Sequence, residues 1–201
     1  MSYKPQKSAM RVVITGFGPY GGRDINCSWL ALLMVKDKFQ SKPIDGVEID
    51  FRQIAVLYDE VDKFEDKLWK EEPNLVIHCG EGPFNKPRFE ILAHNDNYLK
   101  QDIHNCLPGD NTCWKESGFD RLECRLDVDN VVESLKKMNL SFEVSQDAGR
   151  YLCEYIYYKS LMYAKDSSSK VAFVHVPIGE EFLNLSSDFL YHFIISCVKQ
   201  L

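Results

Sequence analysis

The stretch Arg11–Gly22, RVVITGFGPYGG, joins an apolar run to a loop that carries three glycines at the spacing G-x-G-x-x-G. The apolar run predicts a strand. A glycine-rich turn directly after a strand serves any site where the backbone must approach a ligand closely. The spacing therefore predicts a site at this turn and leaves its ligand open.

Apolar runs like this one alternate along the chain with amphipathic stretches. Strands are predicted at Arg11–Thr15, Val47–Val56, Leu75–Cys79, Leu140–Val144 and Val171–Val176, with a shorter candidate at Arg88–Leu92. Helices are predicted to begin at caps supplied by Asn26, Asp59, Asp127 or Asp129, Ser145 or Asp147, and Ser186. This alternation is typical of an α/β fold whose sheet is covered by helices on both faces.

The length of 201 residues fits one domain. Residues 1–10 are polar and predict a mobile tail, and 11–201 are expected to form a single domain. Residues 100–125 show neither helical nor strand periodicity and are predicted to form a long loop. Loops of this length tend to cover a site, mediate assembly or stay mobile.

Composition excludes several classes of function. A formal net charge of −6, with basic and acidic residues interleaved, leaves no basic surface for nucleic acid. No apolar run approaches the roughly 18 residues of a membrane span. The seven cysteines form no C-x-x-C pair, and the first ten residues lack the apolar core of a signal peptide. A reducing, cytoplasmic location is therefore expected.

A dinucleotide site at Gly16, Gly18 and Gly21 is disfavoured. Dinucleotide binding requires that a helix begin at the third glycine and that an acidic residue stand at the end of the next strand. Here the helix cap comes later, at Asn26, and the acid at the right distance, Asp37, falls inside a helical pattern. A nicotinamide-dependent oxidoreductase is therefore a weaker hypothesis.

Histidines and cysteines elsewhere match no compact zinc module. The residues concerned are interpreted as loop and surface residues: His94, His104, Cys106, Cys113 and Cys124. His78 lies inside the apolar strand LVIHC, where a core histidine bonded to its neighbours is the commoner case. No metal ion is expected.

A cysteine and a histidine near the C-terminal end are predicted to meet. Cys153 lies near the start of a predicted helix, and His175 lies in the strand that runs back along it. The helix rises about 1.5 Å per residue and the strand about 3.3 Å, so both residues reach the same level. An imidazole beside a thiol favours the nucleophilic thiolate. A cap at Asp147 would leave Cys153 beyond the first turn, and so dependent mainly on histidine.

Five segments together resemble the pyroglutamyl-peptidase I family, also called pyrrolidone-carboxyl peptidases. They are TGFGPYGG followed by NCSW, LVIHCGEG, FEILAHN, SQDAGRYLC and AFVHVP, in the family's order, from Arg11 to about Gly179. The resemblance implies a three-layer α/β/α sandwich around a twisted, largely parallel but mixed sheet. It also implies a cysteine exopeptidase that removes N-terminal pyroglutamate from peptides without a metal or cofactor. The oligomeric state stays open.

The resemblance also implies roles for particular residues. Cys153 matches the nucleophile, His175 its base, and Glu90 the acid that orients the imidazole. Phe17 and Tyr20 match the aromatic positions that hold the pyroglutamyl ring, and Gly16 and Gly18 let them approach. A flat apolar slot suits an uncharged lactam and disfavours a charged amine.

Three features depart from the family pattern. Tyr20 stands where phenylalanine is usual, so its hydroxyl needs a partner if it is buried. The segment HCGEGPFNKPRFE is one residue short and carries Glu81 at a usually small apolar position, which makes Glu81 a competing acid. The segment HVPIGEE is also short. The alternative function is a non-catalytic protein that binds pyroglutamyl or related N-termini on the same fold.

Overall fold

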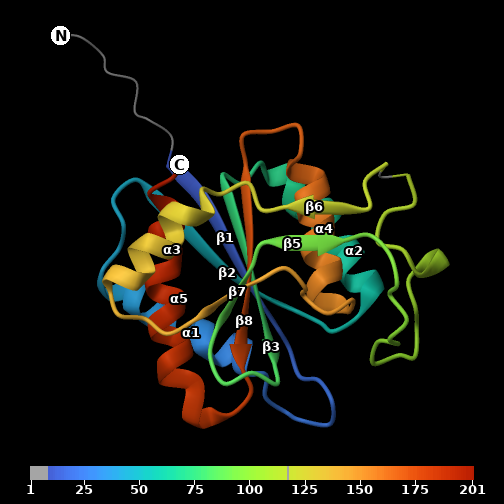
Figure 1. Ribbon diagram of the computed structural model, residues 1–201, viewed down its shortest axis with the longest axis horizontal. Helices are drawn as coiled ribbons and strands as arrows, with labels where there is room; N and C mark the ends of the chain where they lie inside the picture. The colour runs from blue at the N-terminus through green and yellow to red at the C-terminus, as the bar shows by residue number, and fades with distance from the viewer. Residues whose placement is uncertain (1–8, 117) are drawn as a thin grey trace.

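The computed structural model describes residues 9–116 and 118–201. Most of the predicted tail, residues 1–8, lies outside the described residues. The chain forms a six-stranded sheet between two layers of helices, with a separate pair of short strands at one side (Figure 1).

The central sheet has the order β2-β1-β3-β8-β4-β7 and is mixed. Four neighbouring strands are parallel, whereas β4 runs antiparallel to β8 and parallel to β7. The strands are β1 (Met10–Phe17), β2 (Val47–Ile54), β3 (Leu75–Gly82), β8 (Lys170–Pro177), β4 (Arg88–Glu90) and β7 (Glu143–Ser145). The predicted fold class, a three-layer sandwich around a largely parallel sheet, is confirmed.

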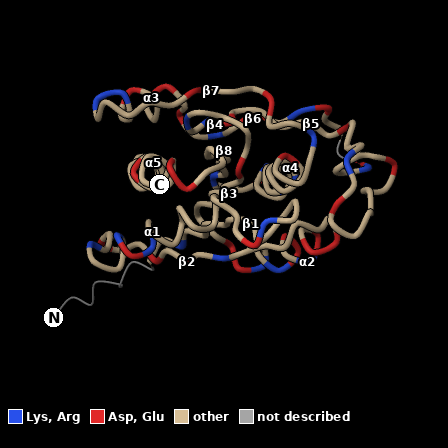
Figure 2. Tube along the Cα trace, turned by 90° about the horizontal axis from the view of Figure 1, so that it is seen from below, with Lys and Arg blue, Asp and Glu red and all other residues tan. Residues whose placement is uncertain are grey.

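Helices cover both faces of this sheet, as the end-on view shows (Figure 2). One face carries α1 (Cys27–Ser41), α3 (Val128–Lys137) and α5 (Leu183–Val198), and the other carries α2 (Tyr58–Leu68) and α4 (Leu152–Ala164). In β1 the side chains of Val12 and Ile14 join the first core, and Val13 points to the other face. Successive strand residues thus serve opposite layers, as the pleat requires.

The predicted loop 100–125 contains regular structure that the pattern does not indicate. Strand β6 (Arg121–Glu123) pairs antiparallel with β5 (Leu92–His94) beside α4. The shorter candidate strand Arg88–Leu92 is therefore split between two sheets, as β4 and β5. The three-residue strand β6 is too short to show a period, which is why the sequence does not reveal it.

Two of the predicted helix caps are confirmed. The Asn26 side chain accepts a hydrogen bond from Ser28 N–H at the start of α1, and Asp127 accepts one from Asn130 N–H at the start of α3. The expected caps at Asp59 and Ser186 are wrong, because those helices already begin at Tyr58 and Leu183.

The expected cap of the cysteine helix at Ser145 or Asp147 is also wrong. Helix α4 begins at Leu152 after the cap residue Tyr151. Asp147 instead accepts a hydrogen bond from Gly149 N–H in the turn before the helix. No helix in the described part of the chain is long and apolar enough to cross a membrane.

Candidate active site

The register of the central strands brings Gly80, His175 and Glu90 together on the α4 face of the sheet. His175 of β8 lies opposite Gly80 of β3 on one side and opposite Arg88 of β4 on the other. Glu90 is two residues beyond Arg88 and shares its face, so it is the diagonal neighbour of His175. Accordingly, Nδ1 of His175 lies 2.9 Å from Oε1 of Glu90.

Cys153 approaches the same point from the helix layer. It is the second residue of α4, so it lies in the first turn, where the partial positive charge of the helix N-terminus is concentrated. The structure thereby corrects the expected cap at Asp147, and with it the consequence that Cys153 would lie beyond the first turn and depend mainly on histidine. The side chain is half-buried, whereas Cys79, Cys113 and Cys197 are buried.

Gly80 explains how the sulfur and the imidazole share this space. A Cβ built on Gly80 would lie 2.6 Å from Sγ of Cys153, 3.0 Å from Cζ of Phe173 and 3.4 Å from Cδ2 of His175. Real Cβ atoms essentially never approach another atom as closely as 2.6 Å. The sulfur therefore occupies the volume that a side chain at position 80 would fill.

The pKa of His175 reflects its two neighbours. Burial lowers the pKa, but the charge of Cys153, its hydrogen bond with His175, and the Glu90 carboxylate raise it more, to about 9. Because Nδ1 faces Glu90, the other ring nitrogen is left for the sulfur. These neighbours therefore favour the protonated, cationic form of the His175 ring.

The two candidate acids occupy different places. Glu90 is fully buried beside His175, and its Oε2 atom has no hydrogen-bond partner among the described residues. Glu81 accepts a hydrogen bond from Cys27 N–H, 2.7 Å away, and forms an ion pair with Arg23. The structure thus brings Glu90 to the imidazole and directs Glu81 to the start of α1.

A buried carboxylate fixes the turn that leads into the cysteine helix. Oε2 of Glu154 accepts a hydrogen bond from Arg150 N–H at 2.6 Å, and its Oε1 accepts one from His94 N–H at 2.9 Å. Gly149 and Arg150 both have positive φ, 95° and 51°, so the chain turns sharply just before Tyr151. Tyr151, the cap residue, makes no side-chain hydrogen bond to the helix among the described residues. The first N–H groups of an α-helix have no partner within the helix, so those of Leu152 and Cys153 point out of its start.

A narrow cavity of ≈ 50 Å³ opens beside Cys153. Its wall is mostly aromatic and aliphatic, which suits a small uncharged group. The lining residues are Phe17, Tyr20, Asn26, Val56, Glu81, Tyr151, Leu152 and Cys153.

The two predicted aromatic residues reach this cavity in different ways. Phe17 is buried, with its N–H 3.1 Å from Oγ of Ser28. Tyr20 is 38% exposed, and its ring centroid lies 5.6 Å from that of Tyr151. Burial, and then the neighbouring Tyr20, raise the pKa of Tyr151. Tyr20 therefore packs its ring against Tyr151, whose own hydroxyl donates a hydrogen bond to Gln101 O at 3.2 Å.

The two predicted glycines lie behind the cavity, outside its lining. A Cβ on Gly16 would come within 2.9 Å of Leu32 and 3.2 Å of the Trp29 backbone, so Gly16 allows α1 to pack closely on β1. Gly18 donates its N–H to Ile54 O and accepts from the Asn26 side chain, 2.8 and 3.0 Å away. Both shape the loop that carries Phe17 and Tyr20.

Comparison with known proteins shows which family the chain is similar to. The profile of the family described as pyroglutamyl peptidase matches residues 10–188. The chain is 36% identical over 178 residues to pyroglutamyl-peptidase 1 of Homo sapiens, covering 87% of this chain and 80% of that protein. The chain belongs to the pyroglutamyl peptidase family. It is therefore a member of a cysteine peptidase family, as the resemblance predicts.

Other members of the family are similar over most of their length. Pyrrolidone-carboxylate peptidase of Thermosipho melanesiensis is 30% identical over 176 residues, which is 85% of this chain and 84% of that protein. A mutant pyrrolidone carboxyl peptidase from Pyrococcus furiosus has the same fold, with a TM-score of 0.83 at 22% identity. That likeness covers 96% of this chain and 100% of the other.

Two other residues of this pyroglutamyl peptidase family member, His78 and Cys113, are buried outside the candidate site. His78 is buried, with its two ring nitrogens 2.7 and 2.8 Å from the hydroxyls of Thr15 and Ser160, as expected for a core histidine. Cys113 lies in the long loop, as predicted, but is buried, so its interpretation as a surface residue is wrong. His94 lies in strand β5, so its interpretation as a loop residue is also wrong. Within residues 9–116 and 118–201, no three His, Cys, Asp or Glu side chains are arranged to hold a metal ion.

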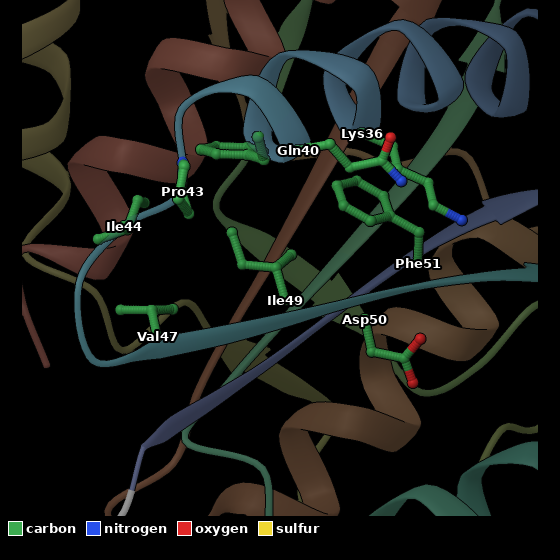
Figure 3. Close-up of a pocket in the computed structure, with 9 residues that line it drawn as sticks. Lys36, Gln40, Pro43, Ile44, Val47, Ile49, Asp50 and Phe51 are labelled. Atoms are coloured by element: carbon green, nitrogen blue, oxygen red, sulfur yellow. The ribbon is translucent and has the colours of Figure 1, made fainter.

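A larger hollow lies on the opposite face of the sheet, between the end of α1 and β2 (Figure 3). Its volume is ≈ 260 Å³, and Ile44, Val47, Ile49 and Phe51 supply apolar surface. Its lining includes no cysteine or histidine, and it lies on the face covered by α1, whereas Cys153 belongs to α4 on the other face. It therefore plays no part in the candidate site.

Sequence reasoning missed three contributors to the site. Gly80, inside the apolar run LVIHCG, carried the available signal, since glycine in a strand often marks a close approach. Tyr151 lies two residues before Cys153, and nothing in the sequence distinguishes it from the rest of the cysteine segment. Phe84 lies edge-on to the His175 ring, with centroids 5.6 Å apart, and no local pattern predicts that contact.

Proposed function

We propose that the chain hydrolyses the peptide bond that follows an N-terminal pyroglutamyl residue, with Cys153 as the nucleophile. The observation that supports this most strongly is the placement of the Cys153 sulfur and the His175 ring around Gly80, with Glu90 bonded to the far ring nitrogen. Membership of the pyroglutamyl peptidase family supports the substrate class.

The reaction begins when the Cys153 thiolate attacks the carbonyl carbon of the pyroglutamyl residue. The carbonyl oxygen becomes an oxyanion, which the N–H groups of Leu152 and Cys153 at the start of α4 stabilise. The His175 imidazolium then donates its proton to the leaving amine, and the shortened peptide departs. The pyroglutamyl group remains on the sulfur as a thioester.

Water completes the reaction by the reverse proton movements. Neutral His175 takes a proton from water, the resulting hydroxide attacks the thioester carbonyl, and the sulfur leaves as a thiolate. Free pyroglutamate is the second product. Throughout, Glu90 holds the imidazole in one orientation and stabilises its cation, as a buried carboxylate does in related triads.

The cavity supplies the proposed substrate selectivity. Phe17 and Tyr20 offer ring surfaces to the lactam, and backbone groups near Cys153 meet its polar atoms. A peptide that begins with glutamine carries a protonated amine, whose burial without a partner is costly. We expect the pyroglutamyl peptide to be cleaved and the matched glutaminyl peptide to be left intact, measured by mass spectrometry of the products. Cleavage of both at similar rates would contradict the proposal.

A non-catalytic binding protein is the alternative. It predicts an inert Cys153, whereas the enzyme predicts a thiol that reacts rapidly at neutral pH. Cys106 is an exposed free cysteine and provides an internal control. Iodoacetamide should label Cys153 faster than Cys106 at pH 7, measured by peptide mass spectrometry. Faster labelling of Cys106 would favour the binding protein.

A further inference from the structure

One residue of the cavity wall beside Cys153, Glu81, belongs to an ion pair with Arg23, which lies outside the lining. Among the described residues that line the cavity, Glu81 is the one carboxylate, and its side chain is only 5% exposed. Arg23 pairs with it from the rim, with a side chain that is 38% exposed. The second oxygen of Glu81 accepts the N–H of Cys27.

The loop that supplies Tyr20 also places Arg23 beside Glu81. Tyr20 and Arg23 form an isolated antiparallel bridge, in which Arg23 N–H donates to Tyr20 O at 3.3 Å. The guanidinium therefore comes from the loop that also supplies Tyr20 to the cavity.

The pair determines the net charge that a ligand meets. An unpaired carboxylate in this wall would attract a protonated amine, because charges interact strongly where water is partly excluded. With Arg23 in place the two charges cancel. The wall then favours an uncharged ring, and an ammonium group finds no free counter-charge to offset its desolvation.

We propose that Arg23 and Glu81 are specificity-determining residues that keep the cavity electrically neutral and so discriminate against peptides with a free, protonated N-terminal amine. This inference rests on the proposed function, because it concerns the substrate class of the same site. It also gives Glu81 a role that is distinct from that of Glu90.

The test measures binding of two matched peptides by calorimetry. Pyroglutamyl-alanyl-alanine amide and glutaminyl-alanyl-alanine amide are titrated into the full chain carrying Cys153→Ala, which prevents turnover. The ratio of their dissociation constants is then compared with the ratio after adding Arg23→Met or Glu81→Gln. Arg23→Met leaves an uncompensated carboxylate, so the preference for the pyroglutamyl peptide should fall about tenfold. Glu81→Gln leaves an uncompensated cation, so that preference should rise.

If Arg23→Met and Glu81→Gln shift the ratio of dissociation constants in opposite directions, the ion pair acts through its charge and not through the structure of the loop. If the pair only holds the Tyr20 loop in place, both substitutions loosen the same loop and move the ratio in the same direction. Arg23→Lys retains the cation and should keep the original ratio. Thermal unfolding of each variant shows whether the fold is intact.

The possible results distinguish this proposal from the proposed function. An unchanged ratio, or equal shifts in the same direction, together with cleavage of pyroglutamyl peptide by the unmodified chain, overturns the role of the pair alone. An unmodified chain that neither cleaves nor binds the pyroglutamyl peptide overturns both proposals.

Discussion

The Nδ1 atom of His175 lies 2.9 Å from Oε1 of Glu90, and the glutamate is completely buried. This contact follows from the register of β4 and β8, in which Glu90 and His175 are diagonal neighbours on one face. The opposite side of the imidazole is left to Cys153. The candidate site is therefore set by strand pairing on one side and by the start of a helix on the other.

Glu90→Gln should lower kcat for a pyroglutamyl substrate by about 10²- to 10⁴-fold, because an amide neither stabilises the imidazolium nor fixes the required tautomer. Glu81→Gln should cost far less, since Glu81 contacts Arg23 and Cys27 instead of the imidazole. Steady-state release of a reporter amine measures both. A larger loss of kcat at Glu81 would reassign the acid.

The fall of kcat/KM at alkaline pH should reflect the loss of the proton from His175. Its pKa is raised to about 9, so the cation is present below that value and is lost as the pH rises through it. We expect kcat/KM to fall near pH 9 in the unmodified chain. Because Glu90 contributes to raising this pKa, Glu90→Gln should move the limb to lower pH. An alkaline limb at the same pH in both proteins would show that another group titrates.

Gly80→Ala should lower kcat/KM by about 10²-fold or more, because even a small displacement of reacting groups has that effect. The added Cβ would collide with the Cys153 sulfur and the Phe173 ring. Gly109→Ala is the matched control, since a Cβ there would lie an ordinary 3.4 Å from the Lys115 side chain in a distant loop. Full activity of Gly80→Ala would show that the sulfur does not need this space.

Much of the fold follows from long sequence patterns. The strands around Val12, Val76 and Val174 are buried between two helical layers, so their apolar runs are long and clear. The sheet order depends on contacts between segments far apart in sequence. The three-residue strands β4 to β7 carry too few residues to show a period. The positions of these strands determine where Glu90 lies. The sequence alone therefore does not decide between Glu90 and Glu81 as the acid that bonds to His175.

The meeting of Cys153 and His175 is predictable from simple geometry, because a helix followed by a returning strand brings their ends to one level. The start of that helix is not predictable from local signals. Asp147 has the composition of a cap, but Gly149 and Arg150 adopt positive φ and delay the helix to Leu152. Tertiary bonds from Glu154 to Arg150 and His94 stabilise this turn.

A buried carboxyl outside the site should make stability depend on pH. Glu65 is fully buried, and burial raises its pKa to about 8 despite hydrogen bonds from Ser160 and Trp69. Its contribution to stability is therefore present below its unfolded pKa and lost as the pH rises through about 8. Glu65→Gln should remove this dependence, so the Tm difference between variant and unmodified chain should shift in favour of the variant between pH 6 and 9.

The Tm difference between Glu65→Gln and the unmodified chain reports the titration of Glu65, because the other titrating groups are present in both proteins. His175 also loses its proton in this range, but it does so in both chains. Burial lowers the pKa of His78 to about 3, so that residue changes charge only under more acidic conditions. A Tm difference that stays constant across the range would contradict the expected effect of burial on Glu65.

The most direct test of the central claim compares the turnover of a pyroglutamyl reporter amide by Cys153→Ala with that by the unmodified chain. Cys106→Ala serves as the control, because Cys106 is exposed and lies in the long loop. We predict that Cys153→Ala keeps the thermal transition and circular dichroism of the unmodified chain and releases no reporter amine, while Cys106→Ala retains full turnover. Undiminished turnover by folded Cys153→Ala would contradict the account.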